Sequence, residues 1–296
     1  MKVLLSSEIG FCFGVKRAVN IVEKLLTEVN RVYVIGNLIH NPLEMNRLKT
    51  KGLISVESVE DIPIGSYVVI RSHGLRQEEI EVLLKKDSKL VDATCPFVKR
   101  IRKVVQSLVD KGYSILLYGD LNHPEVQGVI SYIKERVFVI EKERDLDFIS
   151  ISDKIGLVSQ TTQELSVFIK LAIDLSQRVK ELKLVNTICD ATIRREKAVK
   201  DLVLRSDAIL VVGGKNSANT KRLVGLCQGY LKNVYHIESP KEISGGWFKG
   251  LENIGLASGA STPDWQIKAV LAILRKYGGE VWNERSSSPG KCDLSC

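Results

Sequence analysis

Three cysteines occur in similar surroundings at distant points of the chain. They are Cys12 in Gly10-Phe11-Cys12-Phe13-Gly14-Val15-Lys16-Arg17, Cys95 in Ala93-Thr94-Cys95-Pro96-Phe97-Val98-Lys99-Arg100, and Cys189 in Thr187-Ile188-Cys189-Asp190-Ala191-Thr192, which Arg194 and Arg195 follow. Thiolates are ligands for zinc and for iron–sulfur clusters. Cys95 lies 83 positions after Cys12 and Cys189 lies 94 positions after Cys95, unlike the short spacings of zinc or ferredoxin motifs. Only the fold can bring these thiols together.

Two further polar loops recur after each cysteine. A Gly-x-x-x-polar turn ends 28 positions downstream each time, at His40, His123 and Ser217. After a further strand, a third loop places a polar residue 33, 38 and 44 positions beyond the turn, at His73, Thr161 and Ser261. The fixed first spacing predicts a threefold repeat of about 80 to 95 residues per unit, with three small α/β domains that share one site.

The repeat decides how the cysteines are interpreted. A single cysteine is more often a small buried apolar residue than a ligand, but three in equivalent turns favour a shared metal centre. Each also precedes a helix, whose N-terminal dipole favours the thiolate. Zinc stays open as an alternative; three sulfurs without an evident fourth ligand favour a 4Fe-4S cluster with one open iron. Cys227 is predicted to pack on an apolar helix face, and Cys292 and Cys296 in the polar tail stay unassigned.

The remaining loop residues suit an anion and a proton donor. Three of the four histidines occupy equivalent loops, whereas His236 lies within a strand and is interpreted as structural. Hydroxyl and amide side chains at two helix starts, Ser217, Asn219 and Ser261, predict a diphosphate pocket, although helix capping alone would also explain them. Glu125 follows His123-Pro124. It is either a plain helix-start carboxylate or, beside a buried anion site, an acid with a raised pKa that Thr161 or Thr162 holds by a hydrogen bond.

The elements that must position these residues alternate between strand and helix. Short Val/Ile/Leu-rich runs predict buried parallel strands, among them Ser114–Tyr118, Leu184–Ile188 and Ala208–Val212. Amphipathic segments lie between the strands, such as Phe97–Lys111 and Thr220–Leu231. This order predicts an α/β fold with mainly parallel sheets, whose ligands gather in the loops beyond the strand ends. We expect repeats over 13–94, 95–188 and 189–280, with strand 1–12 joining the third, and a flexible tail over 281–296.

Composition narrows the class of protein. With 296 residues, 44% hydrophobic and 26% charged, the chain is neither disordered nor fibrous. The absence of a long apolar run and of a signal-peptide core predicts a cytoplasmic protein that does not enter a membrane. The net charge of +8 suits an anionic ligand, but aromatic residues do not cluster with Arg or Lys as nucleic-acid binding would require. No Gly-x-Gly-x-x-Gly nicotinamide motif occurs.

Eight motifs together resemble those of the 4-hydroxy-3-methylbut-2-enyl diphosphate reductases. Members of this iron–sulfur oxidoreductase family catalyse the last step of the non-mevalonate pathway of isoprene biosynthesis. They are Gly-Phe-Cys-Phe-Gly-Val at 10–15, Ile-His-Asn-Pro at 39–42, Ser-His-Gly at 72–74, Asp-Ala-Thr-Cys-Pro at 92–96, His-Pro-Glu-Val at 123–126, Gln-Thr-Thr at 160–162, Lys-Asn-Ser-Ala-Asn at 215–219 and Gly-Ala-Ser-Thr-Pro-Asp at 259–264. The match runs in order from residue 1 to about residue 280.

The resemblance implies a trefoil of three pseudo-equivalent small α/β domains around a central 4Fe-4S cluster, with Cys12, Cys95 and Cys189 as its ligands. It implies that the diphosphate contacts His40, His73, His123, Ser217, Ala218, Asn219 and Ser261, and that Thr161 helps to position the substrate hydroxyl. Ala218 stands where the family has a serine, so one hydroxyl contact is missing unless the backbone N–H serves instead.

The implied reaction is reductive dehydroxylation to isopentenyl and dimethylallyl diphosphate, with Glu125 as proton donor and two electrons from ferredoxin or flavodoxin. Two other functions are compatible with the cysteine pattern. A non-redox hydro-lyase would use the open iron as a Lewis acid and would turn over without reductant. A cluster-bearing redox sensor or nucleic-acid-binding regulator would show salt-sensitive nucleic-acid affinity and no small-molecule turnover.

Overall fold

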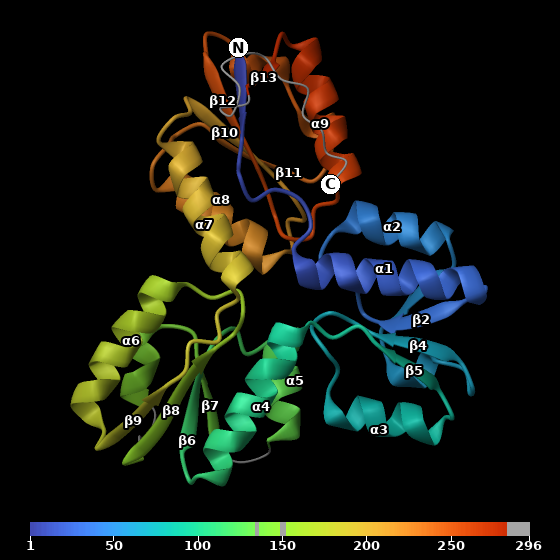
Figure 1. Cartoon of the computed structure of the whole chain (residues 1–296), viewed down its shortest axis with the longest axis vertical. Helices are drawn as coiled ribbons and strands as arrows, with labels where there is room; N and C mark the ends of the chain where they lie inside the picture. The colour runs from blue at the N-terminus through green and yellow to red at the C-terminus, as the bar shows by residue number, and fades with distance from the viewer. Residues whose placement is uncertain (134–135, 149–151, 283–296) are drawn as a thin grey trace. The chain divides into compact units, whose positions relative to one another are not determined.

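The computed structural model describes residues 1–133, 136–148 and 152–282 (Figure 1). Its strands form three wholly parallel sheets, which confirms the predicted α/β class. Sheet A contains β1 (Lys2–Leu5), β10 (Ala208–Val212), β11 (Val234–Ile237), β12 (Asn253–Ser258) and β13 (Glu280–Trp282). Sheet B contains β2 (Val32–Ile35), β3 (Leu53–Val56), β4 (Tyr67–Ile70) and β5 (Lys89–Asp92). Sheet C contains β6 (Ser114–Tyr118), β7 (Val137–Ile140), β8 (Lys154–Ser159) and β9 (Glu181–Leu184).

The described residues also form nine α-helices and four short 3₁₀ turns. The helices are α1 (Phe13–Glu28), α2 (Pro42–Thr50), α3 (Gln77–Lys85), α4 (Pro96–Asp110), α5 (Pro124–Tyr132), α6 (Leu165–Arg178), α7 (Asp190–Val203), α8 (Ala218–Gln228) and α9 (Asp264–Lys276). The 3₁₀ turns are η1 (Val59–Asp61), η2 (Glu143–Phe148), η3 (Pro240–Glu242) and η4 (Gly245–Phe248). None of the helices in the described part of the chain is long and apolar enough to cross a bilayer.

The three sheets repeat one strand order. It is β3-β2-β4-β5 in sheet B, β7-β6-β8-β9 in sheet C and β11-β10-β12-β1 in sheet A. Sheet A has a fifth strand, β13, beside β1. β1 therefore stands in sheet A where β5 and β9 stand in the other sheets, and it pairs with β12 from Lys2↔Asn253 to Leu5↔Leu256. Each cysteine thus follows the fourth strand of its sheet. In sheet A this strand, β1, comes from the N-terminal end of the chain, whereas the other strands of the sheet lie beyond residue 207.

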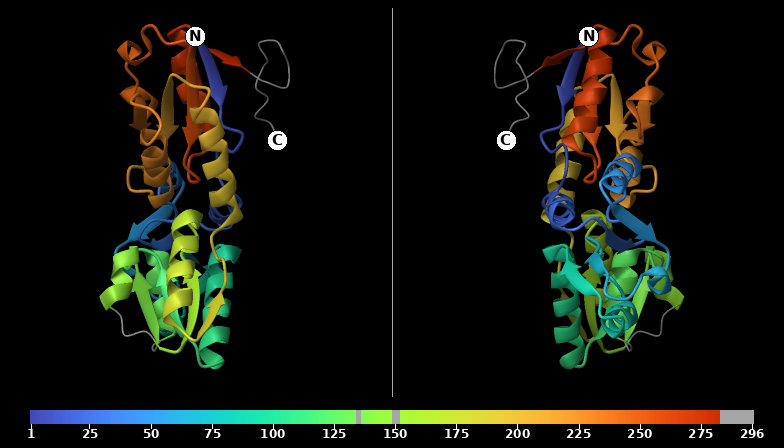
Figure 2. Two further views of the ribbon diagram at one scale, coloured as in Figure 1. Left: turned by 90° about the vertical axis from the view of Figure 1, so that its left-hand side faces the viewer. Right: turned by 90° about the vertical axis from the view of Figure 1, so that its right-hand side faces the viewer.

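Helices cover both faces of sheet A (Figure 2). Leu210 and Val212 face a core with α9, while the alternate residues Ile209 and Val211 face a core with α7 and α8. This alternation is the period of a strand, and burial on both sides explains why β10 is apolar at every position. Two cores hold the sheet rigid, which fixes the loops at its carboxyl edge.

Sheets B and C belong to one compact part of the molecule. α4 and α5 pack on one face of sheet C and α6 lies on the other, as Figure 1 shows. α3, which covers sheet B through Leu83, also contacts α5. By contacts, the chain divides into unit 1 (Met1–Lys16, Ile39–Thr50 and the described residues from Ile193 on) and unit 2 (Arg17–Leu38 and Lys51–Thr192). The segment around α2 is thus held by unit 1, although it lies between two strands of sheet B in sequence.

Some predicted elements end elsewhere in the structure. The predicted strand Leu184–Ile188 is wrong, because β9 ends at Leu184 and the hydroxyl of Thr187 donates to the carbonyl of Ser159 at 2.6 Å and accepts from its N–H at 2.8 Å. The Thr187 side chain therefore makes the hydrogen bonds that the backbone of a neighbouring strand would make to Ser159. β13 extends through Trp282, two residues into the predicted tail. Cys292, Cys296 and the rest of the tail lie outside the described residues.

Candidate functional site

The three cysteines are held in the same way in the three α/β subdomains. The N–H of Cys12 donates to the carbonyl of Ala260, that of Cys95 to Ser72 and that of Cys189 to Thr161, each at 2.9 Å. The three acceptors, Ser72, Thr161 and Ala260, each lie two residues beyond the end of a strand, β4, β8 and β12 respectively. All three cysteines stand at a helix start and are half-buried. Cys12 belongs to unit 1, and Cys95 and Cys189 belong to unit 2.

These contacts correct the sequence alignment of the third loops. Because Ser72, Thr161 and Ala260 are equivalent, the residue that corresponds to His73 and Ser261 is Thr162, one position later than the sequence spacing predicted. Thr161 instead occupies the position that bonds the cysteine. The sequence could not decide which threonine is equivalent, because the spacing to these loops varies between the repeats.

In unit 2, Thr161 joins a cysteine loop to Glu125. The Thr161 N–H donates to Oε1 of Glu125 at 2.7 Å, and its hydroxyl donates to Oε2 at 2.6 Å, while its carbonyl accepts the N–H of Cys189. Thr192 donates a further hydrogen bond to that carbonyl at 3.1 Å. One threonine therefore fixes both the orientation of the carboxyl group and the position of the cysteine. Thr162 points elsewhere, and its hydroxyl accepts from Nε2 of Gln160 at 3.1 Å.

The environment of Glu125 favours the protonated form of its carboxyl group. The residue is 2% exposed, and burial raises the pKa of this group, which agrees with one of the two alternatives that the sequence left open. The two hydrogen bonds from Thr161 and the charge of Arg102 lower that pKa and so oppose the effect of burial. Arg102 is itself held between elements, because it donates to the carbonyl of Leu75 at 3.1 Å and lies over the ring of Tyr132 on α5.

Two histidines of unit 2 are linked to the start of the helix that carries Glu125. His123 caps α5, and its Nδ1 accepts the N–H of Glu125 at 3.2 Å. The ring of His73 meets that of His123 edge-on, with 5.3 Å between ring centroids. His73 lies next to Ser72, which bonds Cys95. The structure thus brings His73, His123, Glu125 and the loops of two cysteines together within one unit.

Unit 1 assembles the other predicted contacts around the start of α8. Ser217 caps this helix by accepting the N–H of Thr220 at 3.3 Å, and Ala218 and Asn219 form its first turn. First-turn N–H groups have no acceptor inside a helix, so Ala218 offers a backbone donor although it lacks a hydroxyl. Asn219 is buried, and its Nδ2 has no hydrogen-bond partner among the described residues. A buried donor without a partner suits an anionic ligand.

His40 is tied to unit 1 through its backbone. The hydroxyl of Ser261 donates to the His40 carbonyl at 2.9 Å. Gly214 lies so close that a Cβ there would stand 2.5 Å from the same carbonyl oxygen, so a larger residue would displace the loop. The segment that carries His40 is therefore packed against both polar loops of the third repeat.

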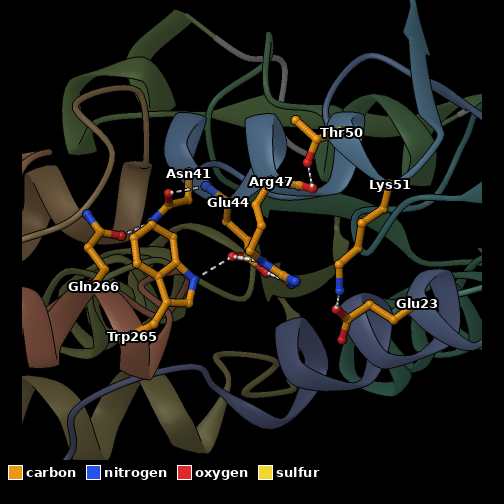
Figure 3. A network of polar contacts seen from close by, with 8 residues as sticks. All are labelled: Glu23, Asn41, Glu44, Arg47, Thr50, Lys51, Trp265 and Gln266. Carbon is orange, nitrogen blue, oxygen red and sulfur yellow. Dashed lines mark hydrogen bonds and ion pairs between the residues drawn. The ribbon is translucent and has the colours of Figure 1, made fainter.

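A buried polar network fixes the helix that follows His40 (Figure 3). Asn41 donates to Oε1 of Gln266 on α9 at 2.9 Å and accepts the N–H of Glu44 at 3.0 Å. Glu44 accepts from Nε1 of Trp265 at 2.8 Å and pairs with Arg47. The two contacts with α9 join residues more than 200 positions apart, and no motif in the sequence indicated them. The sequence offered only an Asn directly before a polar helix and a Glu in its first turn.

Two predicted structural residues lie outside these clusters. Cys227 is fully buried in the core of sheet A, where burial raises the pKa of its thiol to about 12. Nε2 of His236 lies 3.0 Å from the carbonyl of Gly213. Both residues therefore have packing or hydrogen-bonding roles in the fold, as their positions in the sequence predicted.

The three cysteine side chains suit a metal centre that takes thiolate ligands. Three half-buried thiols stand at helix starts, where the N-terminal dipole favours a thiolate, and each is fixed by a backbone hydrogen bond. Beside Cys12 in unit 1, the buried Arg195 supplies a positive charge that suits an anionic centre. Sequence reasoning noted this arginine only as part of a basic stretch.

The chain is similar to known proteins along almost its whole length. A family model described as LytB protein matches residues 3–275. The 4-hydroxy-3-methylbut-2-enyl diphosphate reductase of Campylobacter hominis is 43% identical over 272 residues, which cover 92% of this chain and 98% of that protein. The enzyme of the same name from Aquifex aeolicus is 42% identical over 278 residues, covering 93% and 96% of the two chains.

Two solved structures are similar as well. A structure of (E)-4-hydroxy-3-methyl-but-2-enyl diphosphate reductase, described as the terminal enzyme of the non-mevalonate pathway, has a TM-score of 0.71 at 40% identity and covers 93% of this chain and 100% of its own. The E-1-hydroxy-2-methyl-but-2-enyl-4-diphosphate reductase of Plasmodium falciparum has a TM-score of 0.89 at 27% identity, with 98% and 94% covered.

Proposed function

Because the chain belongs to the LytB protein family, we propose that it reduces 4-hydroxy-3-methylbut-2-enyl diphosphate to isopentenyl and dimethylallyl diphosphate. The substrate gains two electrons and two protons, its C–O bond breaks and water leaves. The observation that carries the proposal is the bridge formed by Thr161, which bonds the carboxyl group of Glu125 and the loop of Cys189. It places a buried acid next to a candidate ligand loop, as proton-coupled reduction requires.

The proposed cofactor is a 4Fe-4S cluster held by Cys12, Cys95 and Cys189. The backbone N–H of each cysteine donates to an equivalent carbonyl, which supports the same role for all three. Three protein ligands would leave one iron of the cluster open for substrate. Such a cluster would supply the two electrons one at a time and an iron that binds the substrate hydroxyl as a Lewis acid. The electrons would come from a ferredoxin or flavodoxin, since the sequence has no nicotinamide motif and its net charge of +8 favours an acidic carrier.

Both units carry candidates for binding the diphosphate. In unit 2, His73 and His123 offer imidazole nitrogens beside Glu125. In unit 1, the candidates are His40, Ser217, Ala218, Asn219 and Ser261. The buried amide of Asn219 is the best supported of these, because its Nδ2 lacks a hydrogen-bond partner in the described part of the protein. Binding the diphosphate would hold the reacting carbon in place and exclude water.

Glu125 would deliver a proton to the leaving hydroxyl group. Burial raises the pKa of its carboxyl group, which favours the protonated form, and the bonds from Thr161 orient it. The carboxylate left after transfer is stabilised by the same two donors and by the charge of Arg102. Thr161 is thus a positioning residue for the acid, in addition to any contact with the substrate hydroxyl or its water.

The proposed reaction is tested by its dependence on a reductant. Purified protein is reconstituted with iron and sulfide without oxygen, then given the hydroxylated diphosphate with and without dithionite-reduced methyl viologen. We expect consumption of the substrate only with reductant. Consumption without reductant would contradict the proposal and favour a hydro-lyase. The absence of turnover together with salt-sensitive nucleic-acid binding would favour a regulator.

The proposed ligands are tested with two cysteine variants. Cys95→Ser should lose the 4Fe-4S absorbance after reconstitution, because a serine hydroxyl is a poor ligand for this cluster. Cys227→Ala is the matched control, since Cys227 is buried in the core of sheet A, and it should keep the spectrum. A full spectrum in Cys95→Ser would remove Cys95 from the ligand set.

A further inference from the structure

A buried arginine stands beside the loop of Cys12 in unit 1. Arg195 is 2% exposed, and its guanidinium donates to backbone carbonyls on both sides of this loop. Nη1 donates to the carbonyls of Glu8 and Ser258, each at 3.0 Å, and Nη2 donates to the carbonyl of Gly10 at 2.9 Å. Gly10 itself donates its N–H to the hydroxyl of Ser258 at 2.9 Å. The arginine therefore holds the residues before Cys12 against the end of β12.

The guanidinium has no carboxylate at hydrogen-bond distance within the described residues. The carboxylate of Glu8 instead pairs with Arg194 at 3.1 Å, and Nε of Arg195 has no hydrogen-bond partner there. Burial lowers the pKa of Arg195, and among its neighbours the charge of Cys12 opposes this most, followed by Glu8. A buried charge is costly unless an opposite charge stands near it. Arg195 therefore sets a fixed positive charge against the residues that lead to Cys12.

A second arginine repeats the arrangement in unit 2. Arg17, near the start of α1, donates to the carbonyls of Asp92 and Thr94, each at 3.2 Å, directly before Cys95. Arg17 lies five residues after Cys12 and Arg195 six residues after Cys189. The basic residues after one cysteine thus bind the loop that leads to another. This recurrence indicates a role connected with the cysteines rather than with one local turn.

We propose that Arg195 is a positioning residue for Cys12, because its hydrogen bonds fix the loop that carries this cysteine and its guanidinium sets a positive charge against that loop. The inference rests on the proposed function in one respect, the role of Cys12 as a cluster ligand. A fixed cation beside a ligand favours the more negative, reduced state of an iron–sulfur cluster, because net charge and hydrogen bonds set its potential. Arg195 would therefore raise the midpoint potential and speed cluster assembly.

The loop is tested first by hydrogen exchange in the full-length protein, before and after reconstitution. Arg195→Met should make the amides of residues 8–12 exchange about tenfold faster or more, because three charged hydrogen bonds are lost. Lys197→Met is the matched control, since Lys197 is an exposed cation on the same helix, α7, and this variant should exchange like the wild type. Unchanged exchange in Arg195→Met would overturn the positioning role.

The charge is tested separately with Arg195→Lys, which keeps the charge but cannot reach three carbonyls. It should loosen the loop as Arg195→Met does, yet keep a midpoint potential close to that of the wild type in an EPR-monitored redox titration. Arg195→Met should lower both the potential and the iron content per protein. Equal potentials in the two variants would overturn the electrostatic role. A wild type that binds no cluster would contradict the proposed cofactor, while the exchange comparison would still decide the positioning role.

Discussion

At the scale of single residues, Thr161 connects the acid to the cysteines. Its N–H and hydroxyl hold both oxygens of Glu125, and its carbonyl holds Cys189. Motif reasoning indicated the glutamate and a neighbouring threonine, but could not choose between Thr161 and Thr162, because both follow Gln160 with identical chemistry. The structure separates them by their partners, since the hydroxyl of Thr161 donates to Glu125 whereas that of Thr162, in the same turn after β8, accepts from Gln160.

The pH profile of Thr161→Val tests how this residue tunes Glu125. An acid donates only when protonated, so activity is present below its pKa and is lost as the pH rises through it. Burial raises the pKa of Glu125, and the bonds from Thr161 lower it. Removing the hydroxyl should therefore move the alkaline limb of the kcat profile to higher pH. Thr27→Val, which loses an exposed hydroxyl on α1, is the control. An unmoved alkaline limb in Thr161→Val would count against Glu125 as the donor.

At the scale of elements, α2 is fixed by α9 rather than by its neighbours in sequence. The bond from Asn41 to Gln266 joins residues 225 positions apart (Figure 3). Periodicity could not predict α2, because Pro42–Thr50 has few apolar residues and its buried face includes Glu44. Strands such as β6 and β10 were predicted to the residue, because buried parallel strands are apolar at nearly every position.

Gln266→Leu tests whether this network positions His40. The change leaves the buried Asn41 amide without its acceptor, which should lower the stability of unit 1 by about 1–3 kcal/mol. We expect KM for the diphosphate to rise severalfold with little change in kcat, because the loop of His40 loosens while Glu125 is untouched. Lys51→Ala breaks the exposed pair with Glu23 at 2.6 Å and should cost less than about 1 kcal/mol. A fall in kcat at constant KM for Gln266→Leu would contradict this role.

In the whole molecule, the described residues form a threefold repeat whose first and last strands, β1 and β13, pair in one sheet. The same strand order recurs in the three sheets, and β1 takes the fourth place in sheet A. The fixed spacing of 28 residues could be read from the sequence, since it spans one helix and one strand without insertions. The division into two units could not, because it depends on how closely segments far apart in the chain pack in the fold.

Val3→Asp tests how far sheet A depends on its N-terminal strand. Val3 is 1% exposed between two helical layers, and an unpaired carboxylate there should cost about 3–5 kcal/mol. Lys2→Asp places the same residue at the exposed neighbouring position and should cost about 1 kcal/mol or less, mainly its contact with the Trp282 ring. Denaturant unfolding measures both. Equal losses would show that β1 is not integral to the sheet.

One assay tests both the reductive removal of the hydroxyl group and the role of Glu125 as the acid. The most direct measurement follows both dye oxidation and the C5 products in an anaerobic assay of the reconstituted wild type and Glu125→Gln. We predict isopentenyl and dimethylallyl diphosphate from the wild type, and turnover lower by about 10²- to 10⁴-fold in Glu125→Gln with its cluster spectrum intact. Wild-type consumption of substrate without these products, or a Glu125→Gln variant within a few-fold of the wild type, would contradict the claim.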